Sequence, residues 1–376
     1  MLKFSRIRAS GPFFAQVDGL RFIAIFLVIG FHLNGYMEGS GYTFPLSIVF
    51  RSGWSGVELF FVISGFVLSL KFIERHTSGR EKPPLKDYYL RRLTRLEPPY
   101  FIALTVYLAI KLAMTEDTSL IANYFASLFY VHNILYNDSS AILGAAWSLE
   151  IEAQYYLLMP VFGQLFRLQN HCFRRCLLAL LILFCMALSH WLDQAEAVTT
   201  LLDFLHLFFT GQLIADLSCI NTDQKNSANG RETLLWDLAA LAAVGGFVFL
   251  MSLPIETKIQ LMPIVFGPFF LAALRGKALK YLLSRKLIYT IGGMCYSAYL
   301  FHTVILRFLV EKTGFVSFAF EHLPPYAAGM LSILVGSVTV FAITALLFAW
   351  FERPFMNPRW ISKFNKAFSS RVNPVQ

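Results

Sequence analysis

The stretch GLRFIAIFLVIGFH, residues 19–32, decides the fold class, because it is apolar throughout except for Arg21 near one end and His32 at the other. An apolar run of this kind is suited to a membrane-spanning helix. In a helix, the eleven residues from Arg21 to His32 span roughly 16 Å and return both side chains to nearly the same face. Ionisable groups inside a bilayer cost free energy and usually mark a functional site. We therefore expect both side chains to line one internal channel.

The composition indicates that the rest of the chain is also membrane-embedded. Of its 376 residues, 56% are hydrophobic and 15% are charged, and the mean hydropathy of +0.57 is too high for a soluble domain. The strands of a β-barrel would alternate apolar and polar residues, whereas LLALLILFCMALSHWL (177–192) is one continuous apolar run. The sequence therefore predicts an all-α fold, a polytopic membrane bundle.

About ten transmembrane helices are predicted, each as an apolar window bounded by polar or Pro/Gly-rich breaks. The windows are 19–36, 53–72, 97–114, 146–167, 177–192, 202–219, 234–252, 258–274, 288–310 and 327–350. The stretch 115–145 is predicted to hold a re-entrant or interfacial helix.

The distribution of basic residues predicts the orientation. If residue 1 is cytoplasmic, 26 of the 32 lysines and arginines fall on the cytoplasmic side, so both termini are expected there. Anionic lipid headgroups then account for the net charge of +9, and no nucleic acid is needed as a partner. The N-terminal basic leader is typical of an uncleaved signal anchor. Residues 1–355 are expected to form the membrane domain and 356–376 a cytoplasmic tail.

Polar residues near the outer ends of the predicted spans form a first layer around His32. Glu58 lies at a similar depth, where a carboxylate could orient the imidazole, although a neutral carboxyl in a polar cavity is the alternative. Glu152 is expected in the same layer, and Glu150 is expected to be solvated. His206 and His302 are interpreted as polar lining or packing residues. Neither has ligands at metal-binding spacing, and the five cysteines lack a C-x-x-C pair, so we expect no metal and reduced thiols.

A second layer lies near the cytoplasmic ends. Arg92 and Arg95 are three residues apart on one helix face and should point toward Arg21. Three guanidiniums suit phosphate recognition, although anchoring at the lipid interface would explain each of them singly. Asp18 is expected to cap the first helix. Glu352 stands beside Arg353 and is expected to pair with it or with an inner arginine.

Six blocks in this order resemble the membrane acyltransferase 3 family, which includes O-antigen acetylases. The blocks are VDGLRFIAIFLVIGFH (17–32), GVELFFVISGF (56–66), RRLTR (91–95), WSLEIEAQYYLLMP (147–160), YSAYLFH (296–302) and FERPF (351–355). Two positions depart from the usual family pattern. The second block usually has aspartate where this chain has Glu58, and the fourth usually has a second glutamate at the position of Ala153.

The resemblance implies an acyltransferase that takes an acyl group, often acetyl, from cytoplasmic acyl-coenzyme A. The group is placed on a hydroxyl of an extracytoplasmic or lipid-linked glycan, in the inner membrane of a bacterium and with a possible partner protein. By position, the resemblance implies that His32 is catalytic and that Arg21, Arg92 and Arg95 lie near the donor. Within the matching blocks, Glu58 and Glu152 are candidate catalytic residues, and Trp147, Ser148, His302 and Glu352 are candidate substrate-contacting or structural polar residues.

Two other classes of protein remain possible from the residues. A proton-coupled transporter could use intramembrane histidine and glutamate residues as a relay, and would be expected to contain paired broken helices. A non-catalytic membrane scaffold would not need His32. For the acyltransferase, two mechanisms are possible: His32 acts as a general base, or His32 carries the acyl group as a transient acyl-histidine.

Overall fold

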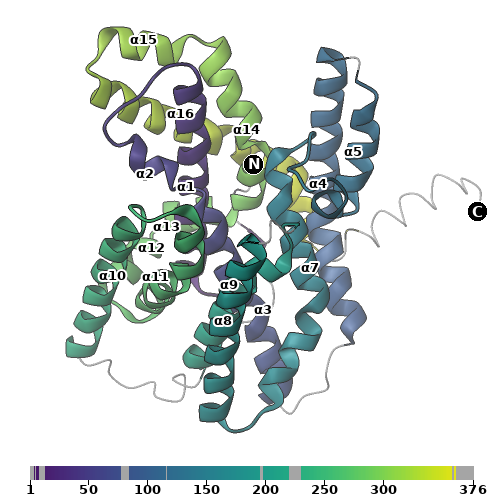
Figure 1. Cartoon of the computed structure of the whole chain (residues 1–376), viewed down its shortest axis with the longest axis vertical. Coiled ribbons are helices and arrows are strands. Elements are labelled where there is room, and N and C mark those ends of the chain that lie inside the picture. Colours follow the sequence, from purple (N-terminus) through teal and green to yellow (C-terminus); the bar gives the residue numbers. More distant parts are fainter. Residues whose placement is uncertain are drawn as a thin grey trace, which may run out of the picture.

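The computed structural model describes residues 4, 6–7, 13–77, 84–115, 117–194, 198–219, 230–357 and 360, and these residues form helices and connecting segments without a strand. Most of the long helices run along the long axis of the molecule (Figure 1). The helices are α1 (Ala15–Gly39), α2 (Ser47–Arg51), α3 (Ser55–Thr77), α4 (Leu85–Met114), α5 (Ser119–Leu128), α6 (His132–Tyr136), η1 (Gly144–Ala146), α7 (Trp147–Phe162), η2 (Gly163–Arg167), α8 (His171–Gln194), α9 (Leu201–Cys219), α10 (Gly230–Leu250), α11 (Ile255–Arg275), α12 (Ala278–Leu283), α13 (Lys286–Gly293), α14 (Cys295–Lys312), α15 (Phe315–His322), α16 (Pro325–Leu347), η4 (Phe348–Glu352) and η5 (Arg353–Met356). The predicted all-α class is confirmed.

Every predicted span coincides with helix, but fewer than ten meet the requirements of a membrane span. In the described part of the chain, eight helices are long and apolar enough to cross a bilayer. A ninth span would be the pair α13 and α14, which is bent by 75°. The predicted span 146–167 is shorter than expected, because α7 ends at Phe162 and continues as the 3₁₀ helix η2. Pro160 lies just before this change and cannot donate a backbone hydrogen bond.

Large apolar side chains cover the outside of the bundle. On α8, Leu180, Leu183 and Phe184 are each at least 60% exposed, and α10 exposes Leu235 and Leu241 to a similar extent. Such a surface is suited to lipid rather than to water. The chain is therefore a multi-pass membrane protein. The predicted tail, 356–376, lies almost entirely outside the described residues, and so do most of the residues before α1.

The stretch 115–145 does not form a span. It contains α5, which has ten residues, and the still shorter α6. Ile121, Phe125 and Phe129 are exposed along this segment. These features fit the predicted interfacial or re-entrant segment.

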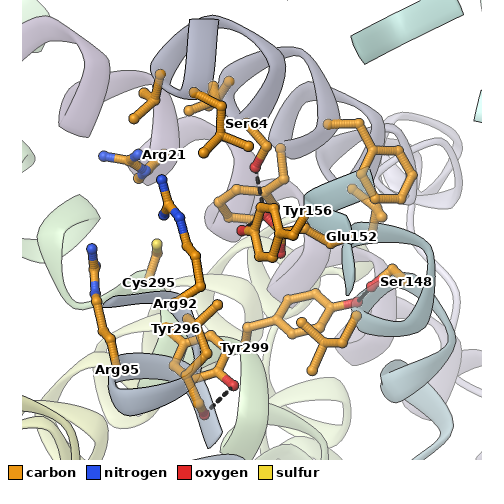
Figure 2. Close-up of a pocket in the computed structure, with 18 residues that line it drawn as sticks. Arg21, Ser64, Arg92, Arg95, Ser148, Glu152, Tyr156, Cys295, Tyr296 and Tyr299 are labelled. Carbon is orange, nitrogen blue, oxygen red and sulfur yellow. Dashed lines mark hydrogen bonds between the residues drawn. The ribbon is translucent and has the colours of Figure 1, made fainter. Parts of the chain in front are cut away.

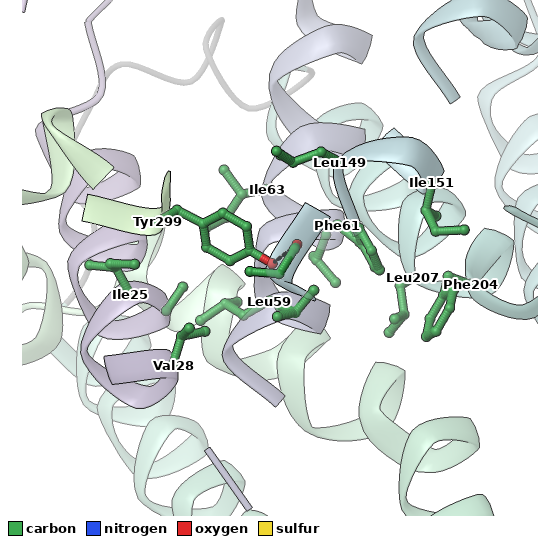
Figure 3. Close-up of a cluster of buried hydrophobic side chains, with 14 of the residues drawn as sticks. Ile25, Val28, Leu59, Phe61, Ile63, Leu149, Ile151, Phe204, Leu207 and Tyr299 are labelled. Carbon is green, nitrogen blue, oxygen red and sulfur yellow. Dashed lines mark hydrogen bonds between the residues drawn. The ribbon is translucent and has the colours of Figure 1, made fainter. Parts of the chain in front are cut away.

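Helix α1 runs through the middle of the bundle and contacts α3, α13, α14 and α16. The apolar core extends from α1 through α3 to α7 and α9, as shown by Ile25, Leu59, Ile151 and Leu207 in Figure 3. Helices α3 and α9 pack so closely that a β-carbon at Gly65 would lie 2.2 Å from the carbonyl oxygen of Phe208. No larger residue fits there, so this position fixes which face of α3 points toward α9.

Candidate active site

A polar pocket lies among α1, α3, α4, α7 and α14, and contains the three predicted arginines. Its empty volume is about 800 Å³, which includes open solvent. Figure 2 shows Arg21, Arg92 and Arg95 on one side of this pocket, with Ser64, Glu152 and Tyr156 facing them. The remaining lining is mostly apolar and aromatic, and consists of Val57, Phe60, Phe61, Ile63, Val67, Leu68, Leu96, Ser148, Leu149, Cys295, Tyr296 and Tyr299. The structure thus brings the three arginines together from two helices, 71 residues apart in sequence at their closest.

Asp18 holds Arg21 at the start of α1. The Asp18 carboxylate accepts a hydrogen bond from Arg21 and another, at 2.9 Å, from Arg6. The prediction that Asp18 caps the helix is wrong, because α1 begins earlier, at Ala15 after Phe14, and Asp18 lies inside its first turn. One buried carboxylate therefore balances part of the positive charge and fixes the position of the Arg21 guanidinium.

The crowding of cations is visible in the chemistry of Arg6, which precedes the first span. The charge of Arg95, followed by burial and the charge of Arg21, lowers the pKa of Arg6 to about 9. Like charges disfavour one another's ionised form, so the direction of this shift reflects the clustering of arginines at this end of the bundle. Such a cluster of positive charge favours anionic ligands.

Arg92 and Arg95 have no carboxylate partner within 4.0 Å among the described residues. The Arg92 guanidinium lies over the ring of Tyr156, 5.2 Å from its centroid. The Nε of Arg95 is buried and lacks a hydrogen-bond partner. Buried donors without partners are rare in native proteins, so these arginines have hydrogen-bonding capacity to offer to a ligand.

Glu152 belongs to this pocket rather than to the layer around His32. Its carboxylate accepts hydrogen bonds from the hydroxyls of Ser64 and Tyr156. The carboxylate therefore faces the arginines, because Arg92 reaches Tyr156, one turn beyond Glu152 on α7. Glu152 thus presents a hydrogen-bonded negative charge to the pocket that the arginines line.

The other polar residues at the start of α7 have structural partners. Glu150 is buried, and its Oε2 accepts a 2.8 Å hydrogen bond from the backbone N–H of Asn133, so the prediction that it is solvated is wrong. Trp147 is half-buried, and its ring packs against Phe204 at a centroid distance of 5.6 Å. Ser148 is buried, and its hydroxyl lies 2.5 Å from that of Tyr299. Ser148 is thus the residue of this group that connects α7 to α14 across the pocket.

Tyr299 separates the pocket from His32. Its hydroxyl donates to the carbonyl oxygen of Ala145 at 2.9 Å, and its ring is 5.7 Å from the ring of His302, which in turn is 4.9 Å from that of His32. His32 is absent from the pocket lining. The pocket that contains the arginines therefore does not extend to His32 in this structure.

Part of the space between Arg21 and His32 is filled by side chains of α1 itself. The turns between Arg21 and His32 carry Ile25 and Val28, which are 0% and 2% exposed and pack into the core that Figure 3 shows together with Tyr299. The helical repeat correctly predicts that Arg21 and His32 share a face, but it does not reveal what fills the space between them.

Glu58 makes no hydrogen bond to His32. Both of its carboxylate oxygens are buried without a hydrogen-bond partner, so the predicted hydrogen bond that would orient the imidazole is not formed. Glu58 precedes Gly65 by seven residues, which places both on the same face of α3. Gly65 packs against Phe208, so this face points toward α9. The alternative interpretation, a carboxyl inside the bundle, fits its position better.

Glu352 supports the part of α14 that enters the pocket. Its Oε2 accepts hydrogen bonds from the backbone N–H of Ser297 at 3.0 Å and from the Ser297 hydroxyl at 2.6 Å. Ser297 lies in the first turn of α14, directly after the bend from α13. Glu352 itself lies in the π-helical turn η4. The hydrogen-bond partner of Glu352 is thus Ser297, and Arg95 is the inner arginine whose charge acts on Glu352 as predicted.

Ser64, Tyr156 and Tyr299 are pocket residues that the sequence analysis did not select. Tyr156 follows Glu152 by four residues and Tyr299 precedes His302 by three, spacings that place each pair on one helix face. This helical spacing could have identified Tyr156 and Tyr299 as candidates from the sequence. His206 makes a packing contact as predicted, because its Nε2 lies 3.2 Å from the carbonyl oxygen of Ile259.

Comparisons with known proteins identify the family that this chain resembles. A family model described as an acyltransferase domain matches residues 14–350. The peptidoglycan O-acetyltransferase OatA of Listeria monocytogenes is 30% identical over 167 residues, which cover 41% of this chain and 25% of that protein. A putative O-acetyltransferase of Staphylococcus aureus is 34% identical over 158 residues, 39% of this chain and 24% of that protein.

The O-acetyltransferase OatA of Staphylococcus aureus is 31% identical over 156 residues, with the same coverage of 39% and 24%. The chain thus spans about a quarter of the length of these relatives. No solved structure matches it.

Proposed function

The chain belongs to the family defined by this acyltransferase domain, and we propose that it is a membrane O-acyltransferase that uses acyl-coenzyme A as donor. The acceptor in this proposal is a hydroxyl group of a glycan or lipid-linked saccharide at or beyond the membrane, and the acyl group is acetyl. The names of the relatives support an acetyl group and a glycan, since one of them is a peptidoglycan O-acetyltransferase. The observation that carries the proposal is the convergence of three arginines on one pocket within a membrane bundle.

The arginine pocket fits the phosphates of coenzyme A. A guanidinium presents a rigid fork of donors that matches phosphate oxygens, and charge-assisted hydrogen bonds of this kind are strong. Arg95 has a buried donor without a partner, and Arg92 is fixed on one side by the ring of Tyr156. In this assignment Arg21, Arg92 and Arg95 hold the donor, and Glu152 with its two hydroxyl partners shapes the opposite wall.

The orientation in the proposal follows from the basic residues. With 26 of the 32 lysines and arginines on the side of residue 1, both termini are cytoplasmic and the arginines face the compartment that holds acyl-coenzyme A. His32 then lies roughly 16 Å farther toward the outer side. The protein would lie in the cytoplasmic membrane of a bacterium, and a partner protein could present the saccharide.

His32 is the base in this proposal. Its imidazole accepts the proton of the acceptor hydroxyl while the oxygen attacks the thioester carbonyl, so that a C–O bond forms and the C–S bond breaks. The same proton then passes to the sulfur of coenzyme A, which leaves as the thiol. Because Tyr299 lies between the pocket and His32, this step requires Tyr299 to move as the acyl group advances.

A covalent route through His32 is the alternative within the same function. In that route the imidazole nitrogen takes the acyl group from sulfur and passes it to the hydroxyl in a second step. Rapid quenching of the donor reaction without acceptor separates the routes. Label retained on His32 would establish the covalent route, and its persistent absence would favour direct transfer.

The test of the function is acyl transfer by the purified protein in lipid, with radiolabelled acetyl-coenzyme A and saccharide acceptors. We expect base-labile label on the acceptor with the wild-type protein and none above background with His32→Ala. His206→Ala is the matched control, because it removes another buried histidine that packs against a backbone carbonyl of α11. Equal transfer by the wild-type protein and His32→Ala would refute the assignment.

A further inference from the structure

His302 is a buried histidine that the proposed reaction does not use. It is 0% exposed, it lies on α14 one turn beyond Tyr299, and its ring centroid is 4.9 Å from that of His32. The planes of the two imidazoles are tilted by 56°. Two histidines from different helices thus lie side by side just beyond the closed end of the arginine pocket.

The hydrogen bonds of His302 define which nitrogen carries its proton. Its Nδ1 lies 2.7 Å from the carbonyl oxygen of Tyr299 and 3.2 Å from that of Ala298. A carbonyl oxygen can only accept a hydrogen bond, so Nδ1 must be the N–H donor. In the neutral ring, Nε2 then carries a lone pair and can only accept.

This acceptor has no partner. The Nε2 of His302 is buried and makes no hydrogen bond. An unsatisfied buried acceptor has a free-energy cost, so a native structure is expected to give it a donor at some stage of its function. His32 is the neighbouring ring with an N–H to offer, and Tyr299 cannot serve, because its hydroxyl is bonded to Ser148 and Ala145.

We infer that His302 is a positioning residue for His32, with its Nε2 accepting the N–H of the His32 imidazole in the reactive state. The pairing itself is inferred from the contacts of the two histidines. Only the reaction that the pair serves rests on the proposed function. The backbone carbonyls of α14 fix the tautomer of His302, His302 fixes the tautomer and direction of His32, and the second nitrogen of His32 keeps its lone pair for the substrate. A hydrogen bond of this kind also makes that second nitrogen more basic and more nucleophilic.

The inferred hydrogen bond requires the His32 ring to turn toward His302. The two rings do not share one in this structure, but His32 is only half-buried, and its other ring neighbour is Phe31 of the same helix, in an edge-on contact at 5.1 Å. The buried His302 cannot follow, because its Nδ1 is anchored. The acceptor is thus fixed and the base is adjustable, which is the arrangement expected of an orienting group.

Two substitutions at position 302 distinguish positioning from packing. His302→Gln places an amide oxygen near the position of Nε2 and keeps an acceptor, whereas His302→Leu has a similar volume and no acceptor. His206→Leu is the matched control, because it removes a buried imidazole that also contacts a backbone carbonyl. Thermal unfolding of each variant reports whether the bundle is intact.

The first readout does not depend on enzymatic activity. Diethyl pyrocarbonate acylates neutral imidazole nitrogens, and peptide mass spectrometry of the full-length protein in lipid gives the rate at His32 separately. We expect His302→Leu to slow this rate about tenfold, the lower end of the effect of losing an orienting partner. We expect His302→Gln to restore most of the rate and His206→Leu to leave it unchanged.

The second readout is acyl transfer. His302→Leu should lower kcat by about ten- to one-hundredfold with little change in the KM for acetyl-coenzyme A, and should have no further effect in the His32→Ala background. Unchanged modification of His32 in His302→Leu would overturn the inference, and so would equal losses in the Leu and Gln variants. Altered reactivity of His32 in a protein whose transfer does not need His32 would support the pairing and refute only the assignment of His32 as the base.

Discussion

Arg21 and His32 lie at the two ends of one face of α1, and they have different surroundings. Arg21 is paired with Asp18 and opens into a pocket with two further arginines. His32 lies outside that pocket, next to the ring of His302 and beyond Tyr299. The same helix face thus carries an anion site at one end and an imidazole pair at the other, with packed apolar side chains between them.

In the proposed function, this difference separates the residues that hold the donor from the residues that perform the chemistry. The three arginines line one pocket, and the Nε–H of Arg95 has no hydrogen-bond partner there. The histidines are shielded from that site by Tyr299, which is bonded to both Ser148 and Ala145. Under the proposed function, such a partition would protect the thioester from hydrolysis until the acceptor is in place, because it would keep the proposed base away from the donor.

The largest effect is expected at the imidazole end. His32→Ala should reduce acyl transfer by about 10²- to 10⁴-fold, because a general base contributes this much to proton transfer. Binding of acetyl-coenzyme A, measured with a non-hydrolysable thioester analogue, should remain at the wild-type level. A parallel loss of donor binding would show that the two ends form one site and would break the comparison.

The next effect is expected at the arginine end. Arg95→Ala should weaken donor binding by about ten- to one-hundredfold, because a hydrogen bond to a charged group is worth about 1.5–3 kcal/mol. Arg95→Lys should recover only part of this affinity, since an ammonium keeps the charge but not the planar fork.

Isothermal titration of the purified protein with the donor analogue, at two salt concentrations, measures the change. The unrelated surface cation Arg307, which is paired with Glu311 on α14, offers the control substitution Arg307→Ala. Equal donor affinities for Arg95→Ala and the wild-type protein would refute the assignment of this pocket as the binding site of the donor phosphates.

A smaller effect is expected at the partition. Tyr299→Phe keeps the ring but removes the hydroxyl, so the free energy of unfolding should fall by about 1 kcal/mol. Acyl transfer should stay at or above the wild-type rate, because the ring is freed from Ser148 and Ala145 and moves aside more readily. Chemical denaturation and the transfer assay measure the two quantities. A large loss of transfer would instead place the Tyr299 hydroxyl in the reaction.

The sequence was a good guide to helices and to residues linked by helical spacing. The apolar windows predicted where helices run, and the spacing of Arg92 and Arg95 predicted that they lie on one helix face, because both depend on local periodicity. The 75° bend between α13 and α14 and the early end of α7 reduced the number of spans, and neither follows from hydropathy alone. The transporter alternative predicted broken helices in pairs. The described helices contain one such broken span, made of α13 and α14, so this alternative is not favoured.

Contacts between helices were the part that local patterns could not provide. Depth along the membrane placed Glu58 and Glu152 together with His32, but depth does not specify which neighbour a side chain faces. The face of α3 that carries Glu58 is set by the close approach of Gly65 to α9, and Glu152 is set by Ser64 and Tyr156. Only the packing of particular residues decides such questions.

The smallest effect is expected at Glu58, where the sequence and the structure disagree most. Both oxygens of its carboxyl are buried without partners, and a buried charge without a partner is unfavourable. Glutamine has nearly the same shape as glutamate and no charge. The melting temperature of Glu58→Gln should therefore either rise or fall by no more than about 2–4 °C. Acyl transfer should stay close to the wild-type rate, with His32→Ala as the inactive reference. If Glu58 instead oriented His32 in a state that this structure does not contain, the rate should fall about 10²-fold or more, as expected when a catalytic imidazole loses its carboxylate.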